Sequence, residues 1–80
     1  MSYTIQDLER DLVQGREIEF IYNNCQYSIT RIKKGWSLSK FYDESSIQNF
    51  STHVDLLSHA RIEEQLLVTI LNKIEISAIF

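Results

Sequence analysis

The chain has 80 residues, of which 44% are apolar and 24% are charged, and its formal net charge is -3. This length excludes a multidomain enzyme, and the composition is that of a folded globular domain rather than a disordered segment. A net negative charge gives no general attraction for nucleic acid, although residues 21–42 carry four basic and no acidic side chains. We therefore predict a single domain over residues 1–80, with a basic segment between two acidic ones.

The cysteine content and the N-terminal sequence bear on the cellular compartment. Cys25 is the only cysteine, which excludes an intramolecular disulfide, and the first residues show neither the basic region nor the apolar run of a secretory signal. The apolar runs are also far shorter than the roughly 18 residues needed to cross a bilayer. We therefore expect a cytoplasmic protein without a membrane segment.

The first predicted element is a short amphipathic helix near the N-terminus. Thr4 is suited to cap its first turn, with Asp7 three residues later, and Gly15 supplies a stop signal at the other end. Three apolar residues at helical spacing are expected to face the core: Ile5, Leu8 and Leu12.

A β-hairpin is predicted directly after this helix. From Glu17 the apolar residues alternate with polar ones, which indicates a strand. Residues 23–24 are both asparagine and can turn the chain, because asparagine tolerates the left-handed backbone conformation. Pairing across this turn places the large apolar residues on one face in three opposed pairs, Tyr22 with Cys25, Phe20 with Tyr27, and Ile18 with Ile29.

Two further strands are expected after this hairpin. Residues 33–35 are suited to a second turn with Gly35 in the positive-φ position, and residues 36–39 alternate large apolar with small polar side chains in a third strand. Residues 43–46 have the composition of a turn, and residues 47–50 predict a short fourth strand at the edge of the sheet. The strand residues expected to pack against the helices are Ile18, Phe20, Tyr27, Ile29, Trp36 and Leu38.

The last third of the chain predicts helix followed by strand. Residues 52–74 contain no glycine or proline, and Ser51 or Thr52 is suited to cap a helix. The pattern favours two helices with a bend near residues 60–63, and one bent helix is the alternative. Residues 74–80 alternate again and predict a C-terminal strand. The expected fold class is α+β, with an N-terminal helix, a three- or four-stranded antiparallel meander, one or two C-terminal helices and a final strand.

The segment GREIEFIYNNCQYSIT, followed by KKGW and KFYD, resembles a pattern of small uncharacterised proteins from Gram-positive bacteria and their phages. The resemblance covers residues 15–42, and residues 54–57 (VDLL) are similar to the acidic helix that would follow. The sequence departs from the pattern at residues 60–64, where a glycine-containing turn would be expected. The resemblance implies no known activity, but it does imply a phage or mobile-element setting.

The sequence carries no arrangement typical of catalysis or metal binding. Cys25, His53 and His59 lack the close spacing of zinc ligands, and on one helix the two histidines would point to different faces. No serine lies in the strained G-x-S-x-G turn of hydrolases. We therefore expect a non-enzymatic protein with no cofactor and no metal.

Residues 31–44 provide the candidate binding side chains. Cations neutralise phosphates and exposed aromatic rings stack on bases, so residues 31–42 suit nucleic acid in part. Strand alternation sends Trp36 to the core, however, which weakens that interpretation. The candidate partner-binding residues are Arg31, Lys33, Lys34, Lys40, Phe41, Tyr42, Asp43 and Glu44.

The expected function is protein binding. So small a domain has little room for a ligand cleft, whereas an open sheet face or edge can contact a partner directly. We predict an interaction module whose partner is another protein, and the resemblance suggests an inhibitor or anti-defence protein of a phage, similar in role to anti-CRISPR proteins. Nucleic-acid binding by residues 31–42 is the alternative, and the thin core of a short chain also favours a homodimer.

Overall fold

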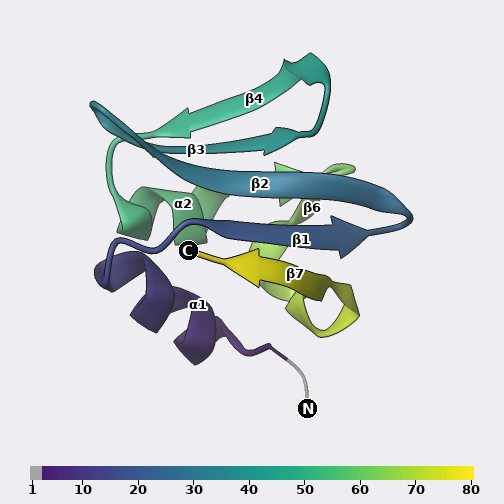
Figure 1. Ribbon diagram of the computed structural model, residues 1–80, viewed down its shortest axis with the longest axis horizontal. Helices are drawn as coiled ribbons and strands as arrows, with labels where there is room; N and C mark the ends of the chain where they lie inside the picture. Colours follow the sequence, from purple (N-terminus) through teal and green to yellow (C-terminus); the bar gives the residue numbers. More distant parts are fainter. Residues whose placement is uncertain (1–2) are drawn as a thin grey trace.

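In the computed structural model, which describes residues 3–80, a five-stranded antiparallel sheet carries two helices on one of its faces (Figure 1). The elements in chain order are α1 (Ile5–Val13), β1 (Ile18–Tyr22), β2 (Cys25–Ile32), β3 (Gly35–Lys40), β4 (Asp43–Phe50), α2 (His53–His59), β5 (Arg61–Ile62), β6 (Gln65–Leu66), two 3-10 turns, η1 (Leu67–Thr69) and η2 (Leu71–Lys73), and β7 (Glu75–Ile79). The strand order is β4-β3-β2-β1-β7, and β5 and β6 form a separate small hairpin. The predicted α+β class is confirmed.

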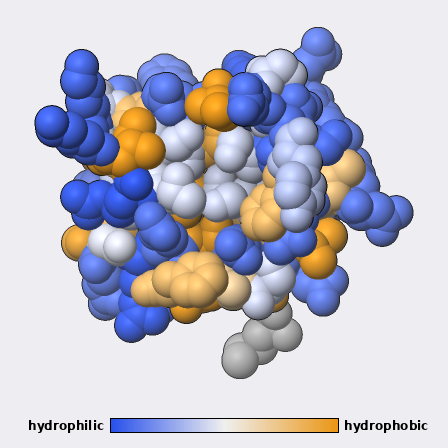
Figure 2. Space-filling model, turned by 45° about the horizontal axis from the view of Figure 1, so that its top comes forward, coloured by the Kyte–Doolittle hydropathy of each residue, from blue (hydrophilic) through white to orange (hydrophobic). Residues whose placement is uncertain are grey.

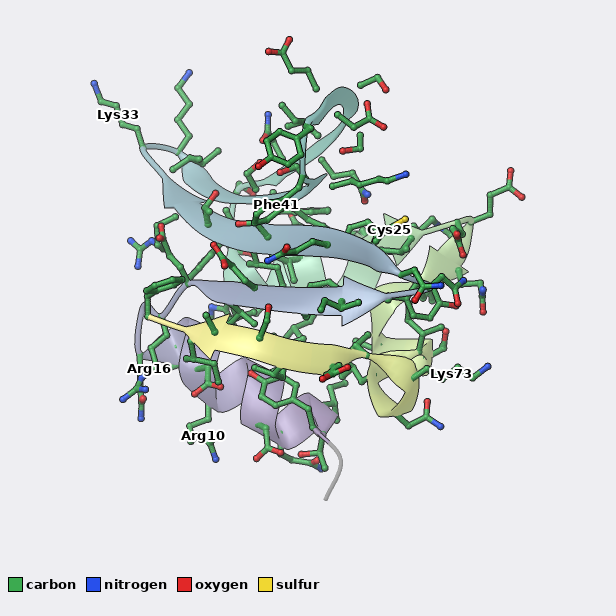
Figure 3. The ribbon with its side chains drawn as sticks, turned by 45° about the vertical axis from the view of Figure 1, so that its right-hand side comes forward. Arg10, Arg16, Cys25, Lys33, Phe41 and Lys73 are labelled. Atoms are coloured by element: carbon green, nitrogen blue, oxygen red, sulfur yellow. The ribbon has the colours of Figure 1, made fainter. Side chains whose placement is uncertain are left out.

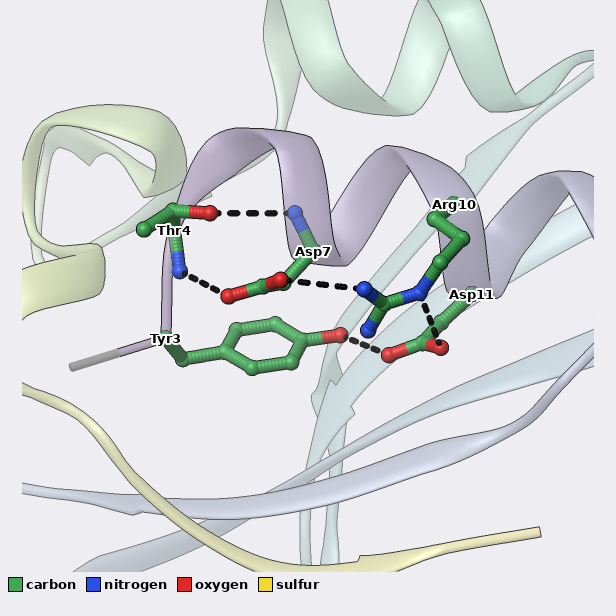
Figure 4. A network of polar contacts seen from close by, with 5 residues as sticks. All are labelled: Tyr3, Thr4, Asp7, Arg10 and Asp11. Atoms are coloured by element: carbon green, nitrogen blue, oxygen red, sulfur yellow. Dashed lines mark hydrogen bonds and ion pairs between the residues drawn. The ribbon is translucent and has the colours of Figure 1, made fainter. Parts of the chain in front are cut away.

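The predicted N-terminal helix is present and begins with a reciprocal cap (Figure 4). The Thr4 hydroxyl accepts a hydrogen bond from the Asp7 backbone N–H at 3.1 Å, and the Asp7 carboxylate accepts one from the Thr4 N–H at 2.9 Å. Leu8 and Leu12 are buried as expected, but Ile5 is 44% exposed. Tyr3, rather than Ile5, packs against the core at this end of the helix.

The buried carboxylate of Asp11 links α1 to Tyr3, the residue that precedes the capping residue Thr4. The Tyr3 hydroxyl donates to Asp11 at 2.5 Å, and the Arg10 guanidinium lies 3.5 Å from the same carboxylate (Figure 4). Burial, together with the hydrogen bond to Asp11, raises the pKa of the Tyr3 phenol well above its usual range. Asp11 is therefore buried with its charge compensated, as a charged core residue requires.

The register predicted for the first hairpin is confirmed. Asn23 and Asn24 have φ angles of 50° and 63°, and two positive angles in a two-residue loop are typical of a type I′ turn. The rings of Phe20 and Tyr27 stack with their centroids 5.4 Å apart. The strand partners are those expected from the sequence: Tyr22 with Cys25, Phe20 with Tyr27, and Ile18 with Ile29.

The turn between β3 and β4 lies earlier than predicted. The chain reverses at residues 41–42, because Lys40 pairs with Asp43, and residues 43–46 therefore belong to β4 rather than to a turn. A register irregularity opposite Leu38 to Lys40 absorbs the extra residues of β4, which explains why this stretch does not alternate. The edge position of β4 and the burial of Trp36 and Leu38 are confirmed.

The prediction of one bent helix or two helices over residues 52–74 is wrong beyond His59. The backbone of Ala60 is extended, residues 61–66 form the β5–β6 hairpin, and only single 3-10 turns follow. The buried residues of this stretch reach the core from short elements instead of from one helix. Ile62 lies on β5, Leu67 lies on η1 and Ile70 follows η1, and the polar residues Glu63 and Glu64 form the turn between β5 and β6.

The predicted C-terminal strand is confirmed. β7 pairs antiparallel with β1, which brings Ile76 opposite Phe20 and Ile79 opposite Ile18, with a bulge between these pairs. The first and last thirds of the chain therefore meet at one edge of the sheet, where β7 is the outer strand (Figure 1).

The two faces of the sheet differ in character. One carries the core residues under the helices, and the other is left uncovered. On the uncovered face Glu19 lies opposite Ser28, Ser28 opposite Ser39, and Thr30 opposite Ser37. Weakly polar side chains accordingly gather in the middle of this side of the molecule (Figure 2). We call this surface the open face.

Candidate interaction surface

The structure divides the candidate binding residues into two groups at opposite ends of β3. Arg31, Lys33 and Lys34 lie at the β2–β3 turn, and residues 40–44 lie at the β3–β4 turn. β3 has six residues, so about 20 Å of strand separates the two groups. Figure 3 shows Lys33 and Phe41 on their different ends of the sheet. The segment thus presents two separate surfaces.

The turn at residues 41–42, which we call the aromatic turn, displays two neighbouring rings. The Phe41 N–H donates to the Gln26 carbonyl at 2.8 Å, which anchors the turn to β2. The ring of Tyr42 is fully exposed, and the two ring centroids lie 6.0 Å apart in an edge-to-face arrangement. The φ angle of Tyr42 is 63°, a left-handed conformation that is a marked outlier for a bulky residue.

Hydrogen bonds from serines fix the strand that follows the aromatic turn. The Asp43 carboxylate accepts from the Ser45 hydroxyl at 2.5 Å and from the Ser45 N–H at 3.1 Å. The Ser46 hydroxyl donates to the Asp43 carbonyl at 2.7 Å and accepts from the Lys40 N–H at 2.8 Å. The Ser45 hydroxyl is the main reason that the pKa of Asp43 lies below its usual range. The aromatic turn is therefore fixed by its hydrogen bond to β2 and by the Ser46 hydroxyl, which bonds to Lys40 before the turn and to Asp43 after it.

A shallow hollow connects the aromatic turn with the open face. Its volume is about 270 Å³, and Ser28, Ser39 and Ile47 line it together with the residues of the aromatic turn. The charged residues at its rim are Lys40, Asp43 and Glu44, so acidic groups outnumber basic ones there. The sequence does not indicate the two serines and Ile47 as site residues, because only the pairing of β2, β3 and β4 brings them together. The signal in the sequence that points to these residues is their alternation with core residues along the strands, which places them on the open face.

A larger cavity of about 520 Å³ lies at the other end of β3. The end of α1, the β2–β3 turn and the link from β4 to α2 surround it, and it contains Arg31, Lys33 and Lys34. The guanidinium of Arg31 lies 5.0 Å from the centre of the Trp36 ring. Because Trp36 is only 4% exposed and one side faces Arg31, its ring is not free to stack on a base.

A third cavity, of about 490 Å³, separates the β3–β4 edge from the β5–β6 hairpin. Lys40 and Arg61 line it together with Glu63 and Glu64, so its charge is mixed. Both glutamates have positive φ angles, 52° and 69°, and the Glu63 carboxylate accepts a hydrogen bond from the Asn23 side chain at 2.7 Å. That contact ties the β5–β6 turn to the β1–β2 turn.

Within residues 3–80, no three histidine, cysteine, aspartate or glutamate side chains lie close enough to hold a metal ion. Cys25 is partly buried beside the first hairpin turn, and His53 and His59 lie at the two ends of α2. His59 is 4.0 Å from Asp55 on the same helix. Neither helix in this range has the length and apolar character needed to span a bilayer.

The comparisons with known proteins leave the geometry as the guide to function. No protein family, no curated protein and no solved structure matches the chain.

Proposed function

We propose that this chain is a non-enzymatic interaction module, and that its partner protein contacts the aromatic turn and the adjoining hollow of the open face. The observation that carries the proposal is the conformation of Tyr42. Its ring is fully exposed, yet its backbone is left-handed with φ of 63°. Holding an L-residue there costs about 1 to 2 kcal/mol, which glycine would avoid. A large aromatic ring that is held in a strained conformation and packs against little of its own fold points to a role outside the fold.

The chemistry of the surroundings suits a protein partner. Tyrosine is enriched at the energetic centres of protein interfaces, because its ring supplies large contact area with few rotatable bonds and its hydroxyl can hydrogen-bond. The hollow beside it, with Ile47 as an apolar wall, can receive one side chain of the partner. Because Asp43 and Glu44 outnumber Lys40 at the rim, the partner surface should be apolar at its centre and basic around it.

We propose further that the module acts as an inhibitor, in line with the phage or mobile-element setting that the sequence resemblance implies. A small domain that displays one strained aromatic turn can block a surface of its target by binding alone. This role would place the protein in the cytoplasm of the bacterial cell. A second copy of this chain could also occupy the surface, and the experiment below distinguishes it from a different partner protein.

Photo-crosslinking at position 42 tests the proposal. A photoreactive phenylalanine analogue in place of Tyr42 keeps an aromatic ring at the turn, and the same analogue in place of Val54 is the control, since Val54 is 58% exposed on α2. We expect a covalent adduct with one cellular protein from position 42 and none from position 54. Adducts from neither position, or only an adduct between two copies of this chain, would contradict the proposed partner.

A further inference from the structure

The cavity of about 520 Å³ at the β2–β3 turn takes no part in the proposed contact with a protein. It opens widely to solvent, and its volume falls in the range of small-molecule sites, about 300 to 1,000 Å³. Leu12, Val13 and Ile32 form apolar walls, while Arg31, Lys33 and Lys34 supply three cations. None of the described residues that line it is acidic, although the chain carries 11 aspartate and glutamate residues. We call it the basic cavity.

Two neighbours restrict the exposed side chain of Arg31 at the basic cavity. Its guanidinium lies over the Trp36 ring at 5.0 Å, a distance at which the cation is attracted to the ring face. On another side it approaches the backbone of Gly15, where an added Cβ would lie 3.3 Å from Nη1. These two neighbours restrict the side chain, so an anion that binds it meets an oriented set of N–H donors.

Two carboxylates beside the segments that line the basic cavity accept hydrogen bonds from neutral groups. Glu17 accepts a hydrogen bond from the backbone N–H of Arg31 at 2.9 Å, and the Asp55 carboxylate accepts one from the Ser51 hydroxyl at 2.9 Å, while the Asp55 backbone N–H donates to the Thr52 hydroxyl. None of the three ion pairs within residues 3–80 involves Arg31, Lys33 or Lys34. The charges of these three cations therefore remain available to a multiply charged anion.

We propose that the basic cavity binds a small organic phosphate, with the phosphate group between Arg31, Lys33 and Lys34 and the organic part against Val13 and Ile32. Phosphate matches the site better than a single carboxylate, because it carries more charge and more acceptor oxygens for three cationic donors. The Thr52 hydroxyl, which accepts from the Asp55 N–H at 3.0 Å, still has its own hydrogen to donate at the cavity wall. The apolar walls, with Val13 64% and Ile32 37% exposed, favour a ligand with a carbon skeleton over phosphate alone.

Titrations followed by NMR test this assignment, with pyrophosphate and ADP as probes at constant ionic strength. We expect saturable shifts at the Arg31 side chain and at the backbone N–H groups of Gly35 and His53, with ADP binding more tightly than pyrophosphate. The double variant Lys33→Gln/Lys34→Gln should weaken binding at least about tenfold. Its matched control is Lys40→Gln/Lys73→Gln, which removes the same charge outside the basic cavity and should leave binding unchanged.

Three results would overturn the assignment. The first is an absence of saturable shifts with either probe, and the second is equal weakening by the two double variants, which would show attraction by net charge alone. The third is binding of a single-stranded oligonucleotide that depends on Lys33 and Lys34 without any binding of pyrophosphate or ADP. In that case the cations would serve nucleic acid instead of a small phosphate.

Discussion

The side-chain amide of Gln48 binds both backbone polar groups of Arg61, much as a neighbouring strand would. Gln48 Nε2 donates to the Arg61 carbonyl at 2.6 Å, and Gln48 Oε1 accepts from the Arg61 N–H at 3.0 Å. Gln48 lies on the edge strand β4, and Arg61 begins the β5–β6 hairpin. One side chain therefore connects the main sheet to the hairpin that replaces the expected helix.

Replacing Gln48 by alanine should lower the free energy of unfolding by about 1 to 2 kcal/mol, because each net hydrogen bond contributes about 0.5 to 1.5 kcal/mol. Chemical denaturation followed by Trp36 fluorescence measures this loss. Asn49→Ala is the control, since Asn49 is the exposed neighbour on the other face of β4, and it should change stability by less than about 0.5 kcal/mol. Equal effects of the two changes would show that the Gln48 contact contributes nothing.

The two glycines should respond very differently to alanine. A Cβ on Gly35 would lie 2.0 Å from the Phe50 carbonyl oxygen, and its φ of 143° is unfavourable for any other residue. Gly35→Ala should therefore cost at least about 2 kcal/mol. A Cβ on Gly15 meets only Nη1 of the Arg31 side chain, at 3.3 Å, so the φ of 77° accounts for most of an expected cost of about 1 kcal/mol. Thermal unfolding of both variants ranks them, and a larger loss for Gly15→Ala would be inconsistent with the close approach of β3 and β4.

The cap of α1 should make stability sensitive to acid. The backbone hydrogen bond from Thr4 is the main cause that holds the pKa of Asp7 below its ordinary value of 3.8. A carboxyl whose pKa is lowered in the folded state stabilises the protein above the unfolded pKa, and this contribution is lost as the pH falls through the folded pKa. Asp7→Asn should therefore lose less stability than the wild type between about pH 5 and pH 2. Urea unfolding across this range measures the difference, and parallel curves for the two proteins would contradict it.

Local backbone chemistry and strand alternation predict most of this fold. The residue pattern from Glu17 to Ile29 predicts its own register, because a shift by one residue would move every apolar side chain to the open face. The residue pattern no longer predicts the structure after His59. No local feature of the sequence indicates that the Gln48 side chain binds the backbone of Arg61, which lies 13 residues later in the chain. Contacts between distant segments decide the structure there, and propensity favours helix because glycine and proline are absent.

The candidate binding residues were predicted as one segment, and the sheet separates them. Lys33 and Tyr42 lie nine positions apart in the sequence, but β3 is extended between them. The left-handed backbone of Tyr42 had no signal in the sequence, because tyrosine normally avoids that conformation. Similarly, the basic cavity needs residues from α1 and from the β4–α2 link, which only the folded chain brings together.

Replacing Tyr42 by glycine gives the most direct test of the proposed protein contact, with Glu64→Gly as its matched control. Both residues occupy left-handed turn positions, with φ of 63° and 69°, so both changes should relieve strain and raise stability by about 0.5 to 1 kcal/mol. The measurement is the amount of the crosslinked partner protein that each tagged variant recovers from lysate. We predict that Glu64→Gly recovers as much as the wild type, while Tyr42→Gly recovers less by at least about tenfold despite its greater stability. Full recovery of that partner by Tyr42→Gly would contradict the account.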